Sequence, residues 1–116
     1  MSLVRITALS LIEIVGDTFA KNFSNQGGIF NLGMGLLGYV GVFIFLVISL
    51  QGSTLLMVNG AWDGMSAITS SIFAYFILGE RFESLSQYFG LVIIIFGMYL
   101  LKVPLFSDKP FTMPSL

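Results

Sequence analysis

The sequence predicts an all-α integral membrane protein, a bundle of four transmembrane helices. Of the 116 residues, 56% are hydrophobic and only 9% are charged. A soluble domain is typically about 25% charged, so 5 Lys+Arg and 6 Asp+Glu cannot cover a water-exposed surface. In addition, the apolar residues fall into four runs separated by short polar stretches. We therefore expect the lipid bilayer to be a partner of this chain.

Each apolar run is close in length to the roughly 20 residues that a spanning helix needs. The four predicted spans cover about residues 3–20, 29–50, 54–78 and 86–101. The first contains Glu13 and Asp17, the third contains Asp63, and the other two are uncharged. Together they predict a transmembrane domain over residues 1–103.

Short polar stretches connect these spans. Residues 22–28 (Asn-Phe-Ser-Asn-Gln-Gly-Gly) are predicted to form a loop, and residues 51–53 a tight turn. Residues 79–84 are predicted to form a solvated turn with a local ion pair. Three prolines make residues 104–116 an extended tail, and we expect it to be mobile unless something holds it.

Glycines in the third and fourth spans are interpreted as packing positions. Gly60 and Gly64 lie four residues apart, and Gly90 and Gly97 lie seven apart, so each pair shares one helix face. Membrane helices pack through small residues of this kind. Short connections also make consecutive helices antiparallel neighbours.

Composition excludes several classes of function. The chain has no Cys and no His, which removes disulfides, thiolate nucleophiles, the common zinc sites and His-based triads. A net charge of −1 gives no basic footprint for nucleic acid. Because no nucleophile–base pair is evident either, we expect neither an enzyme nor a bound cofactor or metal.

The acids of the first span are candidate functional residues. A carboxylate near a helix centre costs about 2.5–3.5 kcal/mol on insertion scales and therefore points to a function. Glu13, Asp17 and Lys21 are spaced by four and share one face. We expect Asp17 to pair with Lys21, leaving Glu13 less compensated. Desolvation disfavours the charged form, so Glu13 can hold either a proton or a cation. The alternative is a structural acid that pairs with a neighbour.

The third span carries a second polar stripe. Its members follow one another at about one helical turn: Asn59, Asp63, Ser66 and Ser70. The stripe either lines a polar cavity or forms hydrogen bonds between helices. Trp62 and Tyr39 can offer aromatic faces to a cation, although rings in membrane helices also serve in packing.

Four motifs follow one another between about residues 9 and 102. They are residues 11–18 (Leu-Ile-Glu-Ile-Val-Gly-Asp-Thr) with Lys21, residues 60–64 (Gly-Ala-Trp-Asp-Gly), residues 76–82 (Phe-Ile-Leu-Gly-Glu-Arg-Phe), and residues 90–98 with their spaced glycines. In this order they resemble the small multidrug resistance family of the drug/metabolite transporter superfamily. Tyr39 falls where that family often has an aromatic residue.

The resemblance implies a four-helix protomer that works as an antiparallel homodimer. It implies that Glu13 is the shared site for protons and a small organic cation, with Trp62 and Tyr39 beside the cavity. It also implies that Gly90, Ile94 and Gly97 belong to the dimer face. The resulting prediction is a proton-coupled exporter of small organic cations.

Some residues depart from the family pattern. Asn59 stands where a Tyr is common, and Asp63 stands where the residue is usually small and uncharged. An alternative prediction is therefore a non-transporting structural or accessory protein of a large membrane assembly, such as the internal membrane of a large virus particle. In that case the tail would be a docking peptide, with Phe106, Phe111 and Met113 as its apolar contacts.

Overall fold

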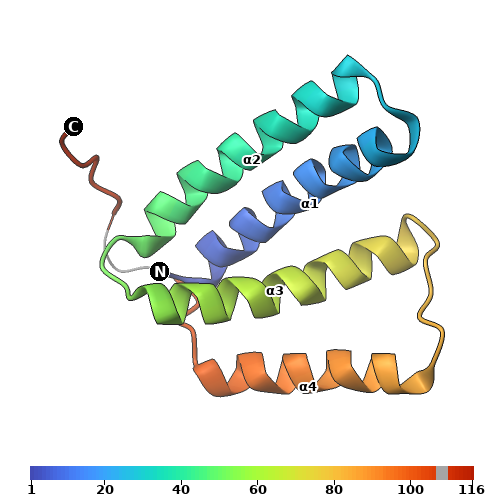
Figure 1. The fold of residues 1–116 in the computed structure, drawn as a ribbon. Coiled ribbons are helices and arrows are strands. Elements are labelled where there is room, and N and C mark those ends of the chain that lie inside the picture. Colours follow the sequence, from blue (N-terminus) through green and yellow to red (C-terminus); the bar gives the residue numbers. More distant parts are fainter. Residues whose placement is uncertain (107–109) are drawn as a thin grey trace.

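Four α-helices and no strand make up the part of the chain that the computed structural model describes, residues 1–106 and 110–116. The helices are α1 (Leu3–Gln26), α2 (Ile29–Leu50), α3 (Leu55–Phe76) and α4 (Leu85–Leu101). They lie in the spatial order α2, α1, α3, α4, so that α1 packs on both α2 and α3 (Figure 1). The bundle is flat, with extents of 41 × 37 × 19 Å. The predicted all-α, four-helix fold is thereby confirmed.

Local sequence explains where three helices begin. The hydroxyl of Ser2 accepts from the backbone N–H of Arg5, and that of Thr54 accepts from the N–H of Met57. Ser84 forms a capping box with Gln87 at the start of α4. Such side chains satisfy N–H groups that have no partner inside the helix.

Helix α1 is longer than the sequence predicts. Residues 22–26 were expected in a loop but complete its last turn, and only Gly27 and Gly28 connect α1 to α2. Extending an existing helix gains a hydrogen bond for each residue fixed, so modest helix formers can be added at its end. Gly27 ends the helix with φ 71°, and its N–H donates to the carbonyl of Phe23 at 2.8 Å.

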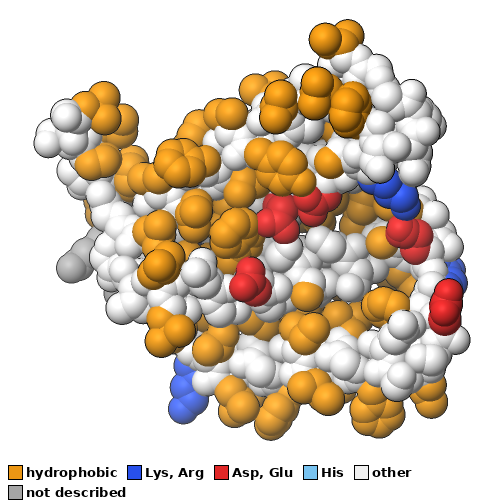
Figure 2. Space-filling model, in the orientation of Figure 1, with side chains coloured by type: hydrophobic (Ala, Val, Ile, Leu, Met, Phe, Trp, Pro, Cys, Tyr) orange, Lys and Arg blue, Asp and Glu red, His pale blue; other side chains and the backbone are white. Residues whose placement is uncertain are grey.

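The hydrophobic core is small and lies where α1, α2 and α3 meet. Its fully or nearly fully buried members are Ile6, Leu9, Val42, Val58 and Ala61. Helix α4 buries no residue completely. The accessible surface is 7884 Å², against about 6,200 Å² expected for a compact soluble monomer of this mass. Large apolar side chains are therefore abundant on the outside of the bundle (Figure 2).

One helix, Ile29–Leu50, is long and apolar enough to cross a membrane by length and composition alone, within the part of the chain described above. Helix α4 is also apolar but has only 17 residues. Glu13 and Asp17 in α1, and Asp63 in α3, lower the apolar character of those helices. The four membrane crossings stay a prediction.

Glycines bring α1 and α2 into backbone contact. A Cβ atom built on Gly38 would lie 2.7 Å from Cα of Gly16 and 2.9 Å from its backbone nitrogen. A Cβ on Gly35 would lie 3.6 Å from the nitrogen of Ala20. Small residues at such a crossing allow two helices to approach closely.

The tail is held by its own chain. The carbonyls of Pro104 and Leu105 accept from the N–H groups of Leu3 and Val4, at 2.6 and 3.3 Å. The tail thus caps the first turn of α1, whose N–H groups otherwise lack partners. Further on, the Gln51 amide donates to the carbonyl of Thr112 at 2.7 Å, and its oxygen accepts the Thr112 N–H at 2.9 Å.

Replacing Gly38 by Ala is expected to destabilise the α1–α2 pair, because the new methyl group meets backbone that cannot move aside. Overpacking of this kind typically costs about 1–3 kcal/mol. Thermal unfolding in detergent measures the effect. Gly33→Ala is the matched control, since nothing lies within 4 Å of its added methyl. An equal loss of stability in both variants would contradict the backbone contact.

Candidate functional site

Three ionisable residues of α1 lie on the side that faces the other helices. Glu13, Asp17 and Lys21 follow at four-residue intervals, and the buried Leu9 continues the same line toward the N-terminus. The acidic side chains gather on one face of the molecule, beside a hollow between α1 and α3 (Figure 2). Each of the three α1 residues contacts a different element.

Glu13 is partly buried between α1 and α3. The hydroxyl of Ser66, in α3, donates a hydrogen bond to Oε1 of Glu13. A partly buried carboxyl group needs such a partner, because burial without one is costly. Ser66 belongs to the predicted polar stripe of α3, and its hydrogen-bond partner is Glu13.

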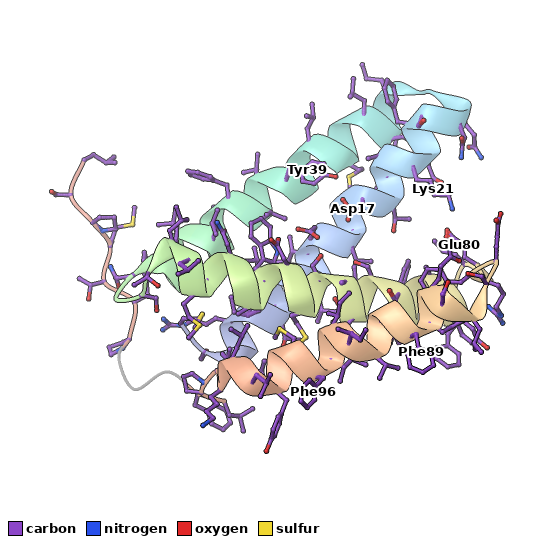
Figure 3. All side chains as sticks on the ribbon, turned by 60° about the horizontal axis from the view of Figure 1, so that its bottom comes forward. Asp17, Lys21, Tyr39, Glu80, Phe89 and Phe96 are labelled. Carbon is purple, nitrogen blue, oxygen red and sulfur yellow. The ribbon has the colours of Figure 1, made fainter. Side chains whose placement is uncertain are left out.

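Asp17 pairs with α2 rather than with Lys21. The hydroxyl of Tyr39 donates to Oδ1 of Asp17 at 2.6 Å, and both side chains are labelled in Figure 3. Tyr39 packs beside Gly16, where an added Cβ would lie 3.5 Å from its ring, an ordinary van der Waals distance. The predicted pairing of Asp17 with Lys21 is therefore wrong, since a hydroxyl from α2 reaches the carboxylate with charge-assisted geometry.

Lys21 pairs instead with Glu80, 59 residues further along the chain. Its Nζ lies 2.9 Å from Oε1 of Glu80, and the two side chains are 52% and 45% exposed. The bridge ties α1 to the connection between α3 and α4 (Figure 3). The prediction of a local ion pair within residues 79–84 is wrong for Glu80, because the cation that pairs with it is Lys21 of α1.

A small pocket lies where these groups meet, between α1 and the end of α3. Its volume is about 140 Å³, and its wall combines charged and hydroxyl groups with apolar side chains. The polar members are Asp17, Thr18, Lys21, Ser70 and Glu80. Its size and lining allow small polar molecules or water to reach the face of α1 that carries the acids.

The remaining residues of the α3 stripe do not converge on this pocket. Asn59 and Asp63 are exposed. Trp62 packs against the hydrophobic core, and its Nε1 atom is buried without a hydrogen-bond partner in the described part of the chain. Of the predicted stripe, Ser66 and Ser70 alone lie toward the acids of α1 in the contacts above.

The glycine positions divide into two groups. Gly60 and Gly64 face α4, where a Cβ on Gly60 would lie 3.8 Å from Leu101 and one on Gly64 would overlap Met98. Added Cβ atoms on Gly90 and Gly97 would meet nothing within 4 Å. Ile94, between them, is 37% exposed. Space is therefore open beside Gly90 and Gly97 in the described structure, while Ile94 is partly covered.

In residues 1–106 and 110–116, no group of three or more His, Cys, Asp and Glu side chains comes together. The polar contacts instead join side chains in pairs. The sequence did not predict the partners in these pairs, including Glu80 as the partner of Lys21. Helical spacing reports only neighbours on one helix, so it carries no signal for a contact across 59 positions.

Comparison with known proteins gives one relevant similarity. The chain is 28% identical over 96 residues to the multidrug resistance protein EbrB of Bacillus atrophaeus, covering 82% of this chain and 81% of that protein. No family model matches the chain. No solved structure matches it either.

The fold is all-helical in the described residues, and this similarity points weakly to a transporter rather than an enzyme. The particular relative, EbrB, is named as a multidrug resistance protein. The similarity gives weak support to the resemblance to the small multidrug resistance family.

Exchanging the charges of Lys21 and Glu80 tests the bridge between α1 and the α3–α4 connection. An exposed pair contributes about 0.2–1 kcal/mol, so Lys21→Glu is expected to lower the melting temperature slightly at low salt. Adding Glu80→Lys should restore it, and high salt should screen the difference. Melting curves in detergent measure both effects. If Glu83→Lys, in the same loop, restores stability equally well, the specific pair is refuted.

Proposed function

We propose that this chain is a multi-pass membrane transporter that exchanges protons for small organic cations, with Glu13 as the shared site. The observation that carries the proposal is the position of the Glu13 carboxyl group. It lies partly buried between α1 and α3, where it accepts a hydrogen bond from the hydroxyl of Ser66. The similarity to a multidrug resistance protein supports the transport of drug-like molecules.

Several features support a position in the membrane. Helix α2 has the length and composition to cross a bilayer. On its outer side, Leu37, Val40 and Phe43 are more than half exposed. On α4, Phe89, Phe96 and Tyr99 are exposed in the same way. An apolar surface of this extent is stable when lipid tails or another protein cover it.

The chemistry of exchange follows from competition for one carboxylate. When Glu13 is protonated, the hydroxyl of Ser66 still donates to it and the site is neutral. Loss of that proton leaves a negative charge in a partly desolvated seam, which favours binding of a cation. Because proton and cation exclude one another, each must leave before the other binds, and their movements are coupled.

Other residues have supporting roles in this proposal. Tyr39 is oriented by Asp17, one turn along α1 from Glu13, and would line the cation path. Trp62 would offer an aromatic face to the cation from the side of the hydrophobic core. Asp63 and Asn59 would add polar groups at the exposed face of α3.

One side of α4 supports a homodimer. Added Cβ atoms on Gly90 and Gly97 would meet nothing within 4 Å, and Ile94, between them, is 37% exposed. Small residues at seven-residue spacing allow two helices to pack closely. A second copy of the chain would cover this face and double the number of Glu13 carboxylates in the assembly.

Glu13→Gln is expected to abolish proton release when a cation is added to purified protein. The amide cannot ionise, but its oxygen can still accept from Ser66, so the fold should persist. Proton release into weakly buffered detergent solution, measured over a panel of organic cations, gives the readout. Glu83→Gln is the matched control, since Glu83 is an exposed acid in a loop. Normal release from Glu13→Gln would refute the proposed site.

A non-transporting role in a membrane assembly is a second candidate, favoured by the end of the tail. Beyond the Thr112–Gln51 anchor, Met113 is 74% exposed and Leu116 is fully exposed. Apolar side chains at a chain end can dock in a groove of another protein.

Removal of residues 113–116 tests this candidate without disturbing the cap on α1, which uses Pro104 and Leu105. A docking tail predicts that the truncated chain is lost from larger complexes on native gels of the source membranes. Proton release should be unaffected. Unchanged complexes after truncation would remove this candidate.

A further inference from the structure

A second and larger cleft lies between the end of α3 and the start of α4. Its volume is about 820 Å³, within the range of roughly 300–1,000 Å³ that is usual for ligand pockets. Most of its lining is apolar or aromatic, and its charged members are one exposed cation, Arg81, and one exposed acid, Glu80. The residues that matter to the argument are Ile72, Tyr75, Phe76, Arg81, Phe82 and Tyr88.

Arg81 provides a fixed positive charge at this cleft. Its guanidinium carbon lies 3.6 Å from the centre of the Tyr75 ring, and its Nη1 donates to the carbonyls of Tyr75 and Glu80 at 2.7 and 2.8 Å. These contacts hold the plane of the guanidinium in place at the end of α3. They use one of its three nitrogens, so the fork retains donors for an anion.

Two acids lie near Arg81 in the chain, and one of them, Glu80, also lines the cleft. Glu80 forms its ion pair with Lys21 of α1. Glu83, the other acid of the connection, is not among the residues that line the cleft. The cleft therefore places the guanidinium of Arg81 beside an apolar wall, while the carboxylate of Glu80 is paired with Lys21, and it suits a ligand that combines an anion with a hydrocarbon chain.

We propose that this cleft binds an anionic phospholipid, with the phosphate on Arg81 and an acyl chain along Ile72 and Phe76. Phe76 is 75% exposed and Ile72 is 54% exposed, so both offer apolar surface to the ligand. Tyr75 lies against the cation, and Phe82 and Tyr88 line the same cleft, as aromatic side chains do at the interface between lipid and water. Phe82 and Tyr88 also contact each other edge to face, with ring centres 4.9 Å apart.

This inference rests on the proposed location in a membrane but not on exchange at Glu13. The cleft lies at the α3–α4 connection, whereas Glu13 contacts the middle of α3 at Ser66. Lipid binding and proton release can therefore be lost separately, and one protein preparation can report on both.

Native mass spectrometry tests the proposal directly. Purified protein in detergent is titrated with phosphatidylglycerol or with phosphatidylcholine that carries the same acyl chains. The wild type is expected to retain phosphatidylglycerol preferentially. Arg81→Gln should bind it roughly tenfold more weakly, the size expected when one charge-assisted contact is lost. Arg81→Lys should retain part of the preference, because it keeps the charge without the fork.

Two further variants keep the test falsifiable. Lys102→Gln removes one positive charge at the other end of α4 and should leave lipid binding unchanged. Ser71→Phe fills the cleft from α3 without altering Arg81, and it should also weaken phosphatidylglycerol binding. This second variant reports on the cleft even if Arg81→Gln fails to fold.

Four outcomes would overturn the proposal. In the first, the wild type binds the two lipids equally. In the second, Arg81→Gln and Lys102→Gln lose the same amount of phosphatidylglycerol binding. In the third, millimolar inorganic phosphate displaces the lipid, and in the fourth, Arg81→Gln loses a dimer and not a bound lipid. The third outcome would indicate a site for free phosphate, and the fourth an interface between copies. Proton release by the same variants shows whether the transport proposal stands independently.

Discussion

The carboxyl group of Glu13 lies on the face of α1 that also forms the hydrophobic core, and the rest of the arrangement accommodates it. Ile6 and Leu9 on this face are fully buried, so an acid that continues the same line enters a partly desolvated seam. A polar group in such a place needs a hydrogen-bond partner. Ser66 supplies it from α3, which fixes the rotation of α1 against α3.

Helix α1 is consequently the centre of the fold. Its opposite contact, with α2, is made by backbone at Gly16 and Gly38, and this closeness brings the hydroxyl of Tyr39 to Asp17. Lys21 reaches the α3–α4 connection, and the tail caps the first turn of α1. Helix α4 contacts only α3 among the helices. Its outer face and the cleft that contains Arg81 are therefore accessible to lipid or to another protein.

The sequence was informative wherever the cause is local. Long apolar runs predicted the four helices, and four-residue spacing placed Glu13, Asp17 and Lys21 on one face. The partners of these residues were not predictable, because Ser66 and Glu80 are separated from them by 53 and 59 positions. Packing and chain topology decide such contacts. The last turn of α1 was missed because Asn and Ser signal loops, although an existing helix extends readily.

A double-mutant cycle on Glu13→Leu and Ser66→Ala tests the central interaction most directly. The free energy of unfolding would be measured in one detergent for the wild type, both single variants and the double variant. The account predicts a coupling energy of about 1 kcal/mol or more, since contacting partners are typically coupled by about 0.5–3 kcal/mol. Effects that add within about 0.3–0.5 kcal/mol would contradict it, because the two side chains would then not depend on each other.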